Sequence, residues 1–429
     1  MRCVIFDLDG TLTASAEGIL RTVAYTAETL GFPMPPAEEA MRFVGPPLKW
    51  SFMHELGMDE ETSTRALQLY RERYHRVGLF ENRVYPGIRG LLRRLKKRGD
   101  WVAIATGKPT EPSRRIIEHF GLSRYFDRIV GPGPGVEHPD KADLIREALP
   151  ETYDEVWMVG DRRFDIEGGR ALGFHTAGAG WGYGTREELE AAGCERYAAT
   201  VAELTEILCP GEETPPGTFV SVEGLDGCGK TTQLRLLSET LERWGFSVRH
   251  TREPGGTPIG EQIRGILLDP ANTAMDPVTE ALLYAASRAQ HVREVIRPAM
   301  AAGEVVLSDR FVDSSIAYQG GGRGLGTERV AAINREAVDG TLPRVTLFLD
   351  LPHEAALARR YGASAPDRME QESGAFHARV EEAFHRLARE NPDRYVVLDA
   401  ALPVDALARQ AAEAVLARLY QAEEEADRP

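Results

Sequence analysis

Residues 219–232 read Phe219-Val-Ser-Val-Glu-Gly-Leu-Asp-Gly-Cys-Gly-Lys-Thr-Thr232, and this stretch decides the fold of the C-terminal half of the chain. An apolar run, a glycine-rich turn and a helical segment follow one another, so we expect a strand, a loop and a helix. The stretch satisfies the pattern GxxxxGK[ST], in which backbone N–H groups and the positive end of the helix surround phosphate oxygens. We therefore expect a nucleoside triphosphate site. It comprises Gly224, Leu225, Asp226, Gly227, Cys228, Gly229, Lys230, Thr231 and Thr232.

The lysine and the first threonine of this loop have distinct tasks. Lys230 would reach the β- and γ-phosphates of the nucleotide, and the hydroxyl of Thr231 would contact Mg²⁺. Lysine is otherwise scarce, because only six of the 51 basic residues are lysines: Lys49, Lys96, Lys97, Lys108, Lys141 and Lys230. These lysines are expected to include positions that require a compact ammonium rather than any positive charge.

Short apolar runs recur along both halves and alternate with longer amphipathic segments. This alternation predicts an α/β fold with two doubly wound parallel-sheet domains. In the first half, the predicted strands are Cys3–Phe6, Trp101–Ala105 and Glu155–Val159. In the second half, they are Phe219–Val222, Ser247–His250, Val305–Leu307, Val345–Leu349 and Tyr395–Leu398. Most of these runs end in a polar residue, and ligands of open α/β sheets bind at the carboxyl ends of strands.

Residues 209–217 are rich in Pro, Gly and Glu and predict an exposed linker between the two halves. We expect domains at 1–208 and 218–421, followed by an acidic, disordered tail at 422–429. Between about residues 14 and 82, helical periodicity replaces strand patterns, which predicts a helical cap inserted after the first strand. A helical bundle packed elsewhere is the alternative.

The chain has 429 residues, a net charge of −15 and 42% hydrophobic residues. The excess of acid argues against a protein that binds nucleic acid or an anionic membrane. No apolar run reaches the length of a membrane span, and the first residues do not form a secretory signal. The four cysteines are scattered without a CxxC pair, so neither zinc nor a disulfide framework is expected. These features predict a reduced, cytoplasmic protein.

Two carboxylates, Asp7 and Asp9, follow the first predicted strand at positions i and i+2. Side chains at this spacing project to the same side of an extended backbone, so both can reach one ligand. Paired acids need a cation, which predicts a Mg²⁺ site completed by Asp161 at a later strand end. One carboxylate can attack phosphorus, and the other can protonate the leaving oxygen. At two further positions, Thr106 and Lys141 would bind the phosphoryl group.

Four elements of this half resemble the haloacid dehalogenase-like phosphatases over residues 1–208. In chain order, they are the acid pair Asp7 and Asp9, then Thr106, then Lys141, and then Asp161 with Asp165. The resemblance implies that Asp7 is the nucleophile and a metal ligand, and that Asp9 is the acid/base beside the metal. It also implies that Asp161, supported by Asp165, holds Mg²⁺. The stretch 179–184, Ala-Gly-Trp-Gly-Tyr-Gly, resembles the phosphoglycolate phosphatase-like or nucleotidase-like branch. Ordinary packing around a glycine-rich turn is an equal explanation for its two aromatic residues.

Three segments after the phosphate-binding loop resemble thymidylate kinase, and the resemblance extends over about residues 219–419. They are Thr251-Arg-Glu-Pro-Gly-Gly-Thr257, Asp309-Arg-Phe-Val-Asp-Ser-Ser315 and Tyr318-Gln-Gly-Gly-Gly-Arg323. The resemblance implies phosphoryl transfer from ATP to the 5′-phosphate of dTMP with Mg²⁺. A homodimer through the kinase helices is implied by the family alone.

An acceptor monophosphate needs arginine side chains, because two anions must be brought together before transfer. The resemblance implies that Arg310 and Arg264 hold the dTMP phosphate and that Asp309 lies near the metal and sugar. It also implies that four side chains contact the deoxyribose and thymine, namely those of Tyr284, Arg288, Tyr318 and Gln319. A core-facing position for Tyr284 and a solvated helix position for Arg264 are the alternatives.

Residues 357–368 resemble the mobile lid that closes over ATP. Thymidylate kinases look divided into two groups, one with an arginine in the phosphate-binding loop and one with a basic lid. Gly227 occupies the position of the loop arginine here, so the lid must supply the charge. Residues 361–366 are uncharged. The basic residues that remain are Arg359, Arg360 and Arg368, and we expect Arg359 and Arg368 to act on the transferring phosphoryl group.

The leading hypothesis is a bifunctional protein that joins a thymidylate kinase to a Mg²⁺-dependent phosphatase acting on a small phosphate ester. One alternative makes the N-terminal half a catalytically silent sensor of a phosphorylated metabolite, although its complete set of acids argues against this. A second alternative makes the C-terminal half a nucleotide-dependent switch without an acceptor. The arginines expected around the acceptor argue against that alternative.

Overall fold

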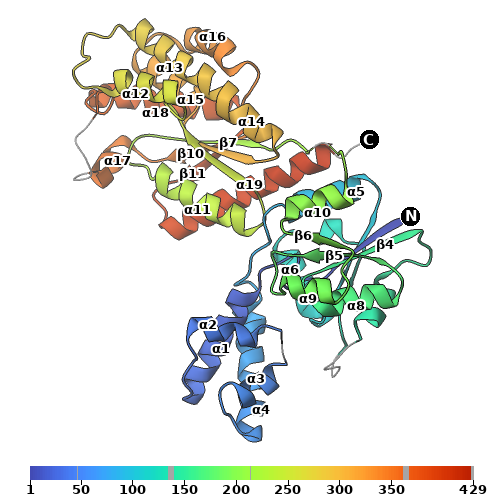
Figure 1. Cartoon of the computed structure of the whole chain (residues 1–429). Helices are drawn as coiled ribbons and strands as arrows, with labels where there is room; N and C mark the ends of the chain where they lie inside the picture. The colour runs from blue at the N-terminus through green and yellow to red at the C-terminus, as the bar shows by residue number, and fades with distance from the viewer. Residues whose placement is uncertain (46, 134–139, 213, 361–366, 427–429) are drawn as a thin grey trace. The chain divides into compact units, whose positions relative to one another are not determined.

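The computed structural model describes residues 1–45, 47–133, 140–212, 214–360 and 367–426. The chain divides into two compact units (Figure 1). The N-terminal unit comprises Met1–Glu213 with Arg243–Gly245, and the C-terminal unit comprises Thr214–Glu242 with Phe246–Pro429. The division falls inside the stretch 209–217, whose composition predicts a linker. Among the described residues, no helix combines the length and apolar character needed to cross a bilayer.

The N-terminal unit is built on a six-stranded parallel sheet in the order β3-β2-β1-β4-β5-β6. β1 lies inside the sheet, and its last four residues are apolar and buried. The strands are β1 (Arg2–Phe6), β2 (Trp101–Ala105), β3 (Arg128–Val130), β4 (Glu155–Gly160), β5 (His175–Ala179) and β6 (Arg196–Ala198). The α/β prediction and the strands expected at β1, β2 and β4 are confirmed.

Helices cover this sheet because each presents an apolar stripe to it. In α5, the residues Ile88, Leu91, Leu92 and Leu95 recur at helical spacing and are all buried. The helices outside the cap region are α5 (Ile88–Lys97), α6 (Thr110–His119), η3 (Ser123–Tyr125), α7 (Lys141–Ala148), α8 (Arg163–Ala171), α9 (Arg186–Ala191) and α10 (Val201–Leu208).

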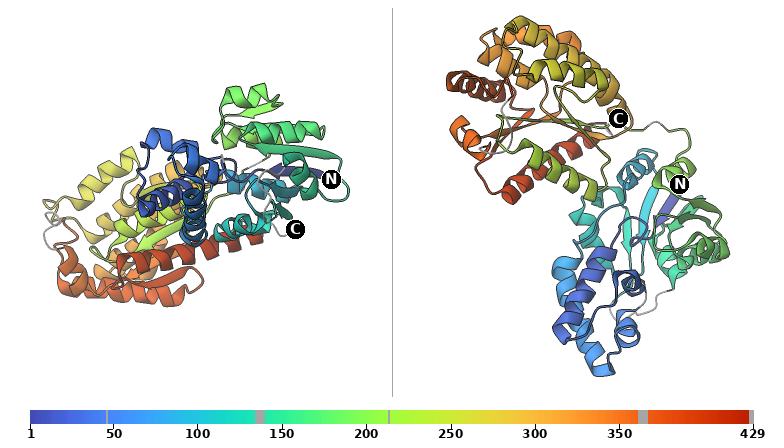
Figure 2. Two further views of the ribbon diagram at one scale, coloured as in Figure 1. Left: turned by 90° about the horizontal axis from the view of Figure 1, so that it is seen from below. Right: turned by 60° about the vertical axis from the view of Figure 1, so that its left-hand side comes forward.

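Between β1 and α5 the chain is helical, and these helices gather as a group beside the strands (blue in Figures 1 and 2). We call this group the cap. Its elements are α1 (Ala16–Leu30), α2 (Ala37–Ala40), η1 (Met41–Phe43), α3 (Leu48–His54), α4 (Glu60–Arg73) and the π-helical turn η2 (Tyr74–Gly78). α1 ends at Gly31, whose φ of 78° closes the helix in a left-handed conformation. α4 begins where the Asp59 carboxylate accepts a hydrogen bond from the Thr62 amide.

The C-terminal unit contains a five-stranded parallel sheet in the order β11-β10-β7-β9-β8. β7 is central and every one of its residues is buried, so the phosphate-binding loop leaves from the middle of the sheet. The strands are β7 (Phe219–Glu223), β8 (Val248–Arg252), β9 (Val305–Asp309), β10 (Val345–Asp350) and β11 (Tyr395–Asp399). Each of the five runs predicted in this half forms one of these strands.

Helices lie on both faces of this sheet, with α11 and α19 on one face and α13, α14 and α16 on the other (Figures 1 and 2). The helices are α11 (Lys230–Arg243), α12 (Pro258–Leu268), α13 (Pro277–His291), η4 (Val292–Ile296), α14 (Arg297–Ala301), α15 (Val312–Ser315), η5 (Ile316–Gly322), α16 (Thr327–Val338), α17 (His353–Arg360), α18 (Gly374–Glu390) and α19 (Val404–Ala426). The expected disordered tail is wrong for residues 422–426, which continue α19, and residues 427–429 lie outside the described part of the chain.

Candidate active sites

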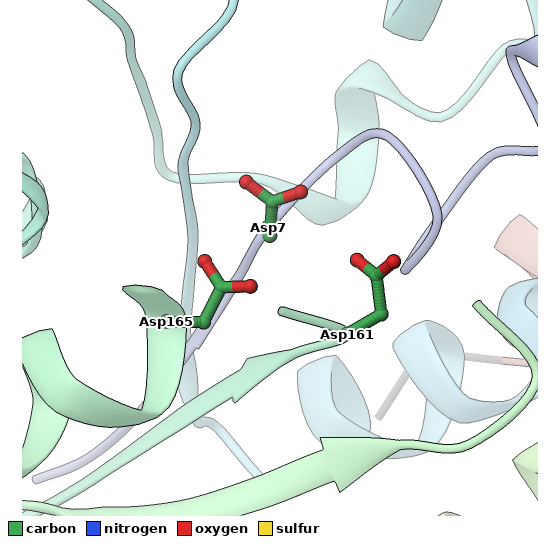
Figure 3. Close-up of side chains that lie close together, drawn as sticks. All are labelled: Asp7, Asp161 and Asp165. Carbon is green, nitrogen blue, oxygen red and sulfur yellow. The ribbon is translucent and has the colours of Figure 1, made fainter. Parts of the chain in front are cut away.

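Three acids from separate parts of the sequence meet at one edge of the N-terminal sheet (Figure 3). Asp7 follows β1, Asp161 follows β4, and Asp165 lies in the first turn of α8. One carboxylate oxygen from each lies within 4.8 Å of the others, and all three side chains are buried. Gly10 has a φ of 91°, and a Cβ there would overlap the Asp161 carboxylate, so the first loop approaches this acid as only glycine allows. Three hard oxygen ligands suit Mg²⁺.

The charge of this cluster is offset by Lys141 at the start of α7. Its Nζ lies 2.7 Å from Asp7 Oδ1 and 2.5 Å from Asp165 Oδ1. Burial and the neighbouring charge of Asp165 raise the pKa of Asp161 to about 7. The pKa of Asp7 is also raised, first by burial and then by the two acids, although Lys141 opposes the shift. The three carboxylates outnumber the single ammonium, so a divalent cation would offset the remaining negative charge of the cluster.

The structure does not bring the Asp9 carboxylate into this cluster, so its place in the predicted metal set stays a prediction. β1 ends at Phe6, so the backbone is no longer extended between Asp7 and Asp9, and the same-side rule for i and i+2 does not apply. Asp9 lies outside the three-acid cluster, and its Oδ2 contacts Lys108 Nζ at 3.1 Å. Its Oδ1 is buried and has no hydrogen-bond partner in the part of the chain that the structure describes. Asp165, expected only as a supporting acid, belongs to the cluster instead.

Thr106 stands at the end of β2, where the sequence places it, and is buried. Its hydroxyl oxygen accepts a hydrogen bond from the Lys108 amide at 3.2 Å. The glycine-rich turn after β5 also reaches this edge, because the Tyr183 amide donates to Asp161 Oδ2 at 2.7 Å. The indole of Trp181 donates to the Thr11 carbonyl oxygen at 3.1 Å. Both aromatic residues therefore bind the loops that build the site.

In the C-terminal unit, the phosphate-binding loop curves around the side chain of Lys230. Its Nζ donates to the carbonyl oxygens of Gly224 and Leu225 at 3.1 and 2.9 Å. Thr231 follows at the start of α11, and its hydroxyl lies 3.5 Å from Asp309 Oδ2 at the end of β9. Hydroxyl and carboxylate oxygens brought together beside a phosphate cradle suit Mg²⁺.

A pocket opens beside this loop, and Asp226 of the loop forms part of its wall. Seven side chains are expected around the phosphate, sugar and base of an acceptor nucleotide, and all of them except Asp309 line this one pocket. The six that line it are Arg264, Tyr284, Arg288, Arg310, Tyr318 and Gln319. The buried Oε1 of Gln319 has no hydrogen-bond partner among the described residues, so a polar atom of the wall is available to a ligand.

Arg310 links the pocket to the phosphate-binding loop. Its Nη1 donates to the Gly224 carbonyl oxygen at 3.0 Å, and its Nη2 lies 2.5 Å from Asp226 Oδ1. Its backbone is left-handed, with a φ of 71°, which a residue with a side chain seldom adopts. Glu223 holds the turn after it, because its carboxylate accepts from the Phe311 amide at 2.7 Å and from the Ser314 hydroxyl at 2.6 Å.

Arg288 is fully buried, and most of its donors serve the protein. Its guanidinium pairs with Glu253 Oε2 at 2.7 Å and donates to the Ser315 hydroxyl at 3.2 Å. It also donates to Asn334 Oδ1. Glu253 in turn binds the buried ring of His291 at 2.9 Å. Sequence reasoning missed this network, although Glu253 stands in a motif that it singled out.

Two of the lid arginines contact other parts of the C-terminal unit. Arg359 Nη1 donates to the Ala400 carbonyl oxygen at 2.8 Å. Arg368 is buried, pairs with Glu280 Oε2 at 2.6 Å and donates to the Leu267 carbonyl oxygen at 2.9 Å. Each guanidinium thus has partners within the protein, and the expected action of both arginines on the transferring phosphoryl group stays a prediction. Residues 361–366 of the expected lid and the side chain of Arg360 lie outside what the structure describes.

The chain matches two protein families along separate stretches. Residues 222–411 match the family model "Thymidylate kinase", and residues 4–179 match "Haloacid dehalogenase-like hydrolase". A thymidylate kinase of Geotalea uraniireducens is 49% identical over 211 residues, which are 48% of this chain and 99% of that protein. One from Thermoanaerobacter sp. is 52% identical over 183 residues, which are 43% of this chain and 89% of that protein.

The chain belongs to the thymidylate kinase family. Its N-terminal stretch is a haloacid dehalogenase-like hydrolase domain. Among solved structures, a predicted phosphatase from Clostridium acetobutylicum is 41% identical and covers 48% of this chain and 97% of that one, with a TM-score of 0.44. A putative phosphatase from Clostridium difficile is 33% identical over 48% of this chain and 97% of that one, with a TM-score of 0.46.

The stretch that matches thymidylate kinase includes the phosphate-binding loop after Val222. It also includes every residue that lines the pocket beside this loop. Several pocket residues were not expected from the sequence. They are Asp226 in a pocket role, Glu253, Pro254, Leu268, Phe311, Ser314, Ser315, Asp367 and Met369. In the hydrolase domain, the missed residue is Lys108, and the scarcity of lysine was the signal that could have found it.

Proposed function

We propose that the C-terminal unit transfers the γ-phosphoryl group of ATP to the 5′-phosphate of dTMP, which gives dTDP and ADP. The observation that carries this proposal is the pocket that six predicted acceptor residues line together with Asp226 of the phosphate-binding loop. A donor site and an acceptor site that share a wall bring the two phosphates together, which is the main requirement of phosphoryl transfer.

In the proposed reaction, an oxygen of the dTMP phosphate attacks the γ-phosphorus of ATP, and the bond to the β–γ bridging oxygen breaks with its electrons staying on ADP. Arg310 and Arg264 would hold the acceptor phosphate, and Lys230 would turn from the loop carbonyls to the β- and γ-phosphates. Tyr284, Tyr318 and Gln319 would orient the base and sugar. When bound, Mg²⁺ would offset phosphate charge beside Thr231 and Asp309.

We propose in addition that the N-terminal unit hydrolyses a small phosphate monoester through an aspartyl-phosphate. The Asp7 carboxylate would attack phosphorus, and the bond from phosphorus to the alcohol oxygen would break as Asp9 donates a proton to that oxygen. Asp9 would then accept a proton from water, which attacks the phosphorus and releases phosphate and Asp7. Thr106 and Lys141 would bind the phosphoryl oxygens. Mg²⁺ held by Asp7, Asp161 and Asp165 would offset charge on the phosphoryl group.

The first test is product chromatography of the full chain with dTMP, ATP and Mg²⁺. We expect dTDP and ADP without thymidine, because hydrolysis of dTMP would destroy the acceptor of the neighbouring unit. Absence of dTDP would contradict the kinase proposal. Release of phosphate from p-nitrophenyl phosphate and from a panel of small esters tests the hydrolase, and its loss in Asp7→Asn assigns the activity to this site. A cytoplasmic location follows as part of the proposal, since ATP is the donor.

The family resemblance also implies a homodimer, and we retain this as a proposal. Three apolar side chains on neighbouring helices of the C-terminal unit are about half exposed, Ile259 and Ile266 on α12 and Leu282 on α13. A dimer interface over these helices would cover these side chains. Sedimentation velocity of the full chain would show a dimer, and a monomer at micromolar concentration would contradict the proposal.

A further inference from the structure

Glu280 of α13 is a buried acid to which the proposed phosphoryl transfer gives no task. Its side chain is only 1% exposed. The amide nitrogen of Gln319 donates to its Oε1 at 2.9 Å, while Arg323 Nη2 and Arg368 Nη1 lie 3.1 and 2.6 Å from its Oε2. A buried carboxylate is costly to desolvate, so it needs such donors. One acid thus binds three side chains that are far apart in the sequence.

The two arginines keep Glu280 in its charged form. Burial alone would raise the pKa of this carboxyl group, but hydrogen bonds from Arg323 and Gln319 and the charges of Arg323 and Arg368 lower the pKa below its ordinary value. An ionised carboxylate has acceptors and no donor. Each neighbour that contacts Glu280 must therefore turn an N–H group toward it.

This requirement fixes the orientation of the Gln319 side-chain amide. A glutamine amide has an oxygen that accepts and an NH₂ group that donates, and it can turn to exchange their places. Here the NH₂ group faces Glu280, because a turned amide would place its oxygen against the negative charge. The amide oxygen, Oε1, is therefore directed away from Glu280. It is buried and has no hydrogen-bond partner among the described residues.

Gln319 lines the pocket beside the phosphate-binding loop, together with Tyr284 and Arg310. Glu280 is not among the described residues that line this pocket, so the acid lies behind its wall. A buried acceptor without a donor is costly, and an N–H group of a ligand would satisfy it. A ligand atom that is itself an acceptor would leave both atoms unsatisfied. The wall thus favours a ligand that presents an N–H to Gln319.

We propose that Glu280 is a positioning residue that determines which base the acceptor pocket takes. By holding the NH₂ group of Gln319, Glu280 makes this side chain present an acceptor to the pocket. The pocket then favours a base whose facing ring nitrogen carries a hydrogen, as N3 of thymine does, over a base whose ring nitrogen is an acceptor, as N3 of cytosine is. This inference rests on the proposed kinase function and names the residue behind its base specificity.

The first measurement compares dTMP with 5-methyl-dCMP on the full chain with ATP and Mg²⁺. The two nucleotides share the sugar, the phosphate and the 5-methyl group, and they differ at N3 and at position 4 of the ring. We expect kcat/KM to be at least tenfold higher for dTMP, because a polar wall rejects a ligand that leaves its acceptor unpaired. Equal values would overturn the inference, and this result needs no variant that folds.

Two variants then test the role of the acid. In Glu280→Gln, the neutral amide can donate as well as accept, so the Gln319 amide is free to turn. We expect the ratio of kcat/KM for dTMP to that for 5-methyl-dCMP to fall at least fivefold. Glu372→Gln is the matched control, because Glu372 also pairs with Arg323 whereas the Gln319 amide donates to Glu280. It should keep the wild-type ratio. An equal loss for both nucleotides in Glu280→Gln would mean that the acid only stabilises the fold, and the inference would fail.

Combined substitutions test whether Glu280 acts through Gln319. Gln319→Met removes the amide but keeps a side chain of similar length, so it should lower the ratio by itself. If Glu280 acts only through this amide, adding Glu280→Gln to Gln319→Met should change the ratio less than twofold. A further fall as large as that of the single Glu280 variant would show an independent effect and would overturn the inference.

A binding measurement separates this inference from the kinase proposal. Calorimetric titration of the full chain with dTMP and with 5-methyl-dCMP, in the absence of ATP, reports the base preference without turnover. Tighter binding of dTMP that is lost in Glu280→Gln supports the positioning role even where no dTDP forms, and then only the kinase proposal fails. Formation of dTDP with a base preference that Glu280→Gln leaves unchanged supports the kinase and overturns the positioning role.

Discussion

Asp161 illustrates how a single residue connects charge, metal binding and pH. Its pKa is raised to about 7 by burial and by Asp165, so the free cluster still holds protons near neutral pH. Mg²⁺ needs the carboxylate form, because a proton and a metal ion compete for the same oxygen. The raised pKa also means that the metal-free folded state loses stability as pH rises through about 7, since an unfolded aspartate has already lost its proton near 3.8.

We therefore predict that Mg²⁺ binds the N-terminal unit more tightly as pH rises from 6 to 8. Asp161, with a pKa of about 7, goes from about one-tenth to nine-tenths ionised over this range, and Asp7, whose pKa is also raised, ionises further as well, so we expect at least a tenfold lower Kd. Calorimetric titration with Mg²⁺ at constant ionic strength measures it. Asp161→Asn should remove most of the binding, and Asp143→Asn, at an exposed acid of α7, should leave it unchanged. A Kd independent of pH would contradict the shift.

Glu223 is a second residue whose burial has a consequence for function. Burial and the charge of Asp313 raise its pKa above the ordinary value, yet both its oxygens accept hydrogen bonds from the turn that carries Arg310. The left-handed backbone of Arg310 costs about 1–3 kcal/mol and persists only where surrounding contacts impose it. Glu223 therefore acts as a positioning residue for a guanidinium expected to bind the acceptor phosphate.

We predict that Glu223→Ala raises KM for dTMP at least tenfold, with a smaller change in KM for ATP, and destabilises the unit by about 1–3 kcal/mol because two donors lose their acceptor. Steady-state kinetics and denaturant unfolding measure the two effects. Glu223→Gln is the control, because an amide oxygen can still accept from Phe311 and should retain most of the affinity. A uniform loss of kcat with both KM values unchanged would argue against positioning.

At the scale of elements, the phosphate-binding loop depends on its approach to α17. Gly227 has a φ of 89°, and a Cβ there would overlap the carbonyl oxygen of Ala356. Gly229 has a φ of 100°, but no atom of the described residues lies within 4 Å of such a Cβ. The two glycines thus share backbone strain and differ in the room around them. An arginine at position 227 has no space in this arrangement, which explains in physical terms why the loop carries glycine there.

We predict that Gly227→Ala impairs ATP binding more than Gly229→Ala. Alanine at either site is destabilised by about 1 kcal/mol or more, because the backbone is left-handed there. At position 227 it must also displace the first turns of α17. Titration with a non-hydrolysable ATP analogue should show at least a tenfold difference in Kd between the two variants. Equal weakening would mean that backbone strain alone decides the effect.

Elements with a clear period were predictable, and short or polar ones were not. Four strands of the C-terminal sheet, β7, β9, β10 and β11, coincide with apolar runs rich in β-branched and aromatic residues, whereas β8 reads Val-Arg-His-Thr-Arg. In the N-terminal sheet, β3 and β6 have three residues each and begin with arginine, and β5 reads His-Thr-Ala-Gly-Ala. Neighbouring strands and helices provide their burial, so local sequence carries little of the signal.

The candidate sites divide along a similar line. Residues at strand ends could be assigned from the sequence, because parallel strands bring their carboxyl ends to one edge of the sheet. Side-chain pairings across the fold could not, such as Lys108 with Asp9 or Arg368 with Glu280. Asp9 shows the limit most plainly, since one turn of backbone after Phe6 separates it from the acids with which its spacing grouped it.

For the whole molecule, two chemistries on one chain raise the question of their independence. The structure gives each unit its own parallel sheet, and each proposed site is built from residues of one unit alone. Asp7 follows β1, the first strand of its sheet along the chain. Lys230 follows the loop after β7, the first strand of the other sheet, and both side chains are buried. Changing either one should thus disable one reaction through local chemistry without disturbing the other sheet.

We predict that Asp7→Asn abolishes ester hydrolysis and leaves dTDP formation within twofold of wild type, whereas Lys230→Ala lowers dTDP formation at least a hundredfold and spares hydrolysis. Asparagine keeps the shape of Asp7 but is not a nucleophile, and alanine removes the charge that would contact the transferred phosphates. Both reactions are followed in one chromatographic assay with dTMP, ATP, Mg²⁺ and a hydrolysable ester. Circular dichroism melts of both variants exclude misfolding as the cause of a loss. If each substitution reduced both activities in a folded protein, the two units would have to be coupled, and the proposal of two independent sites would fail.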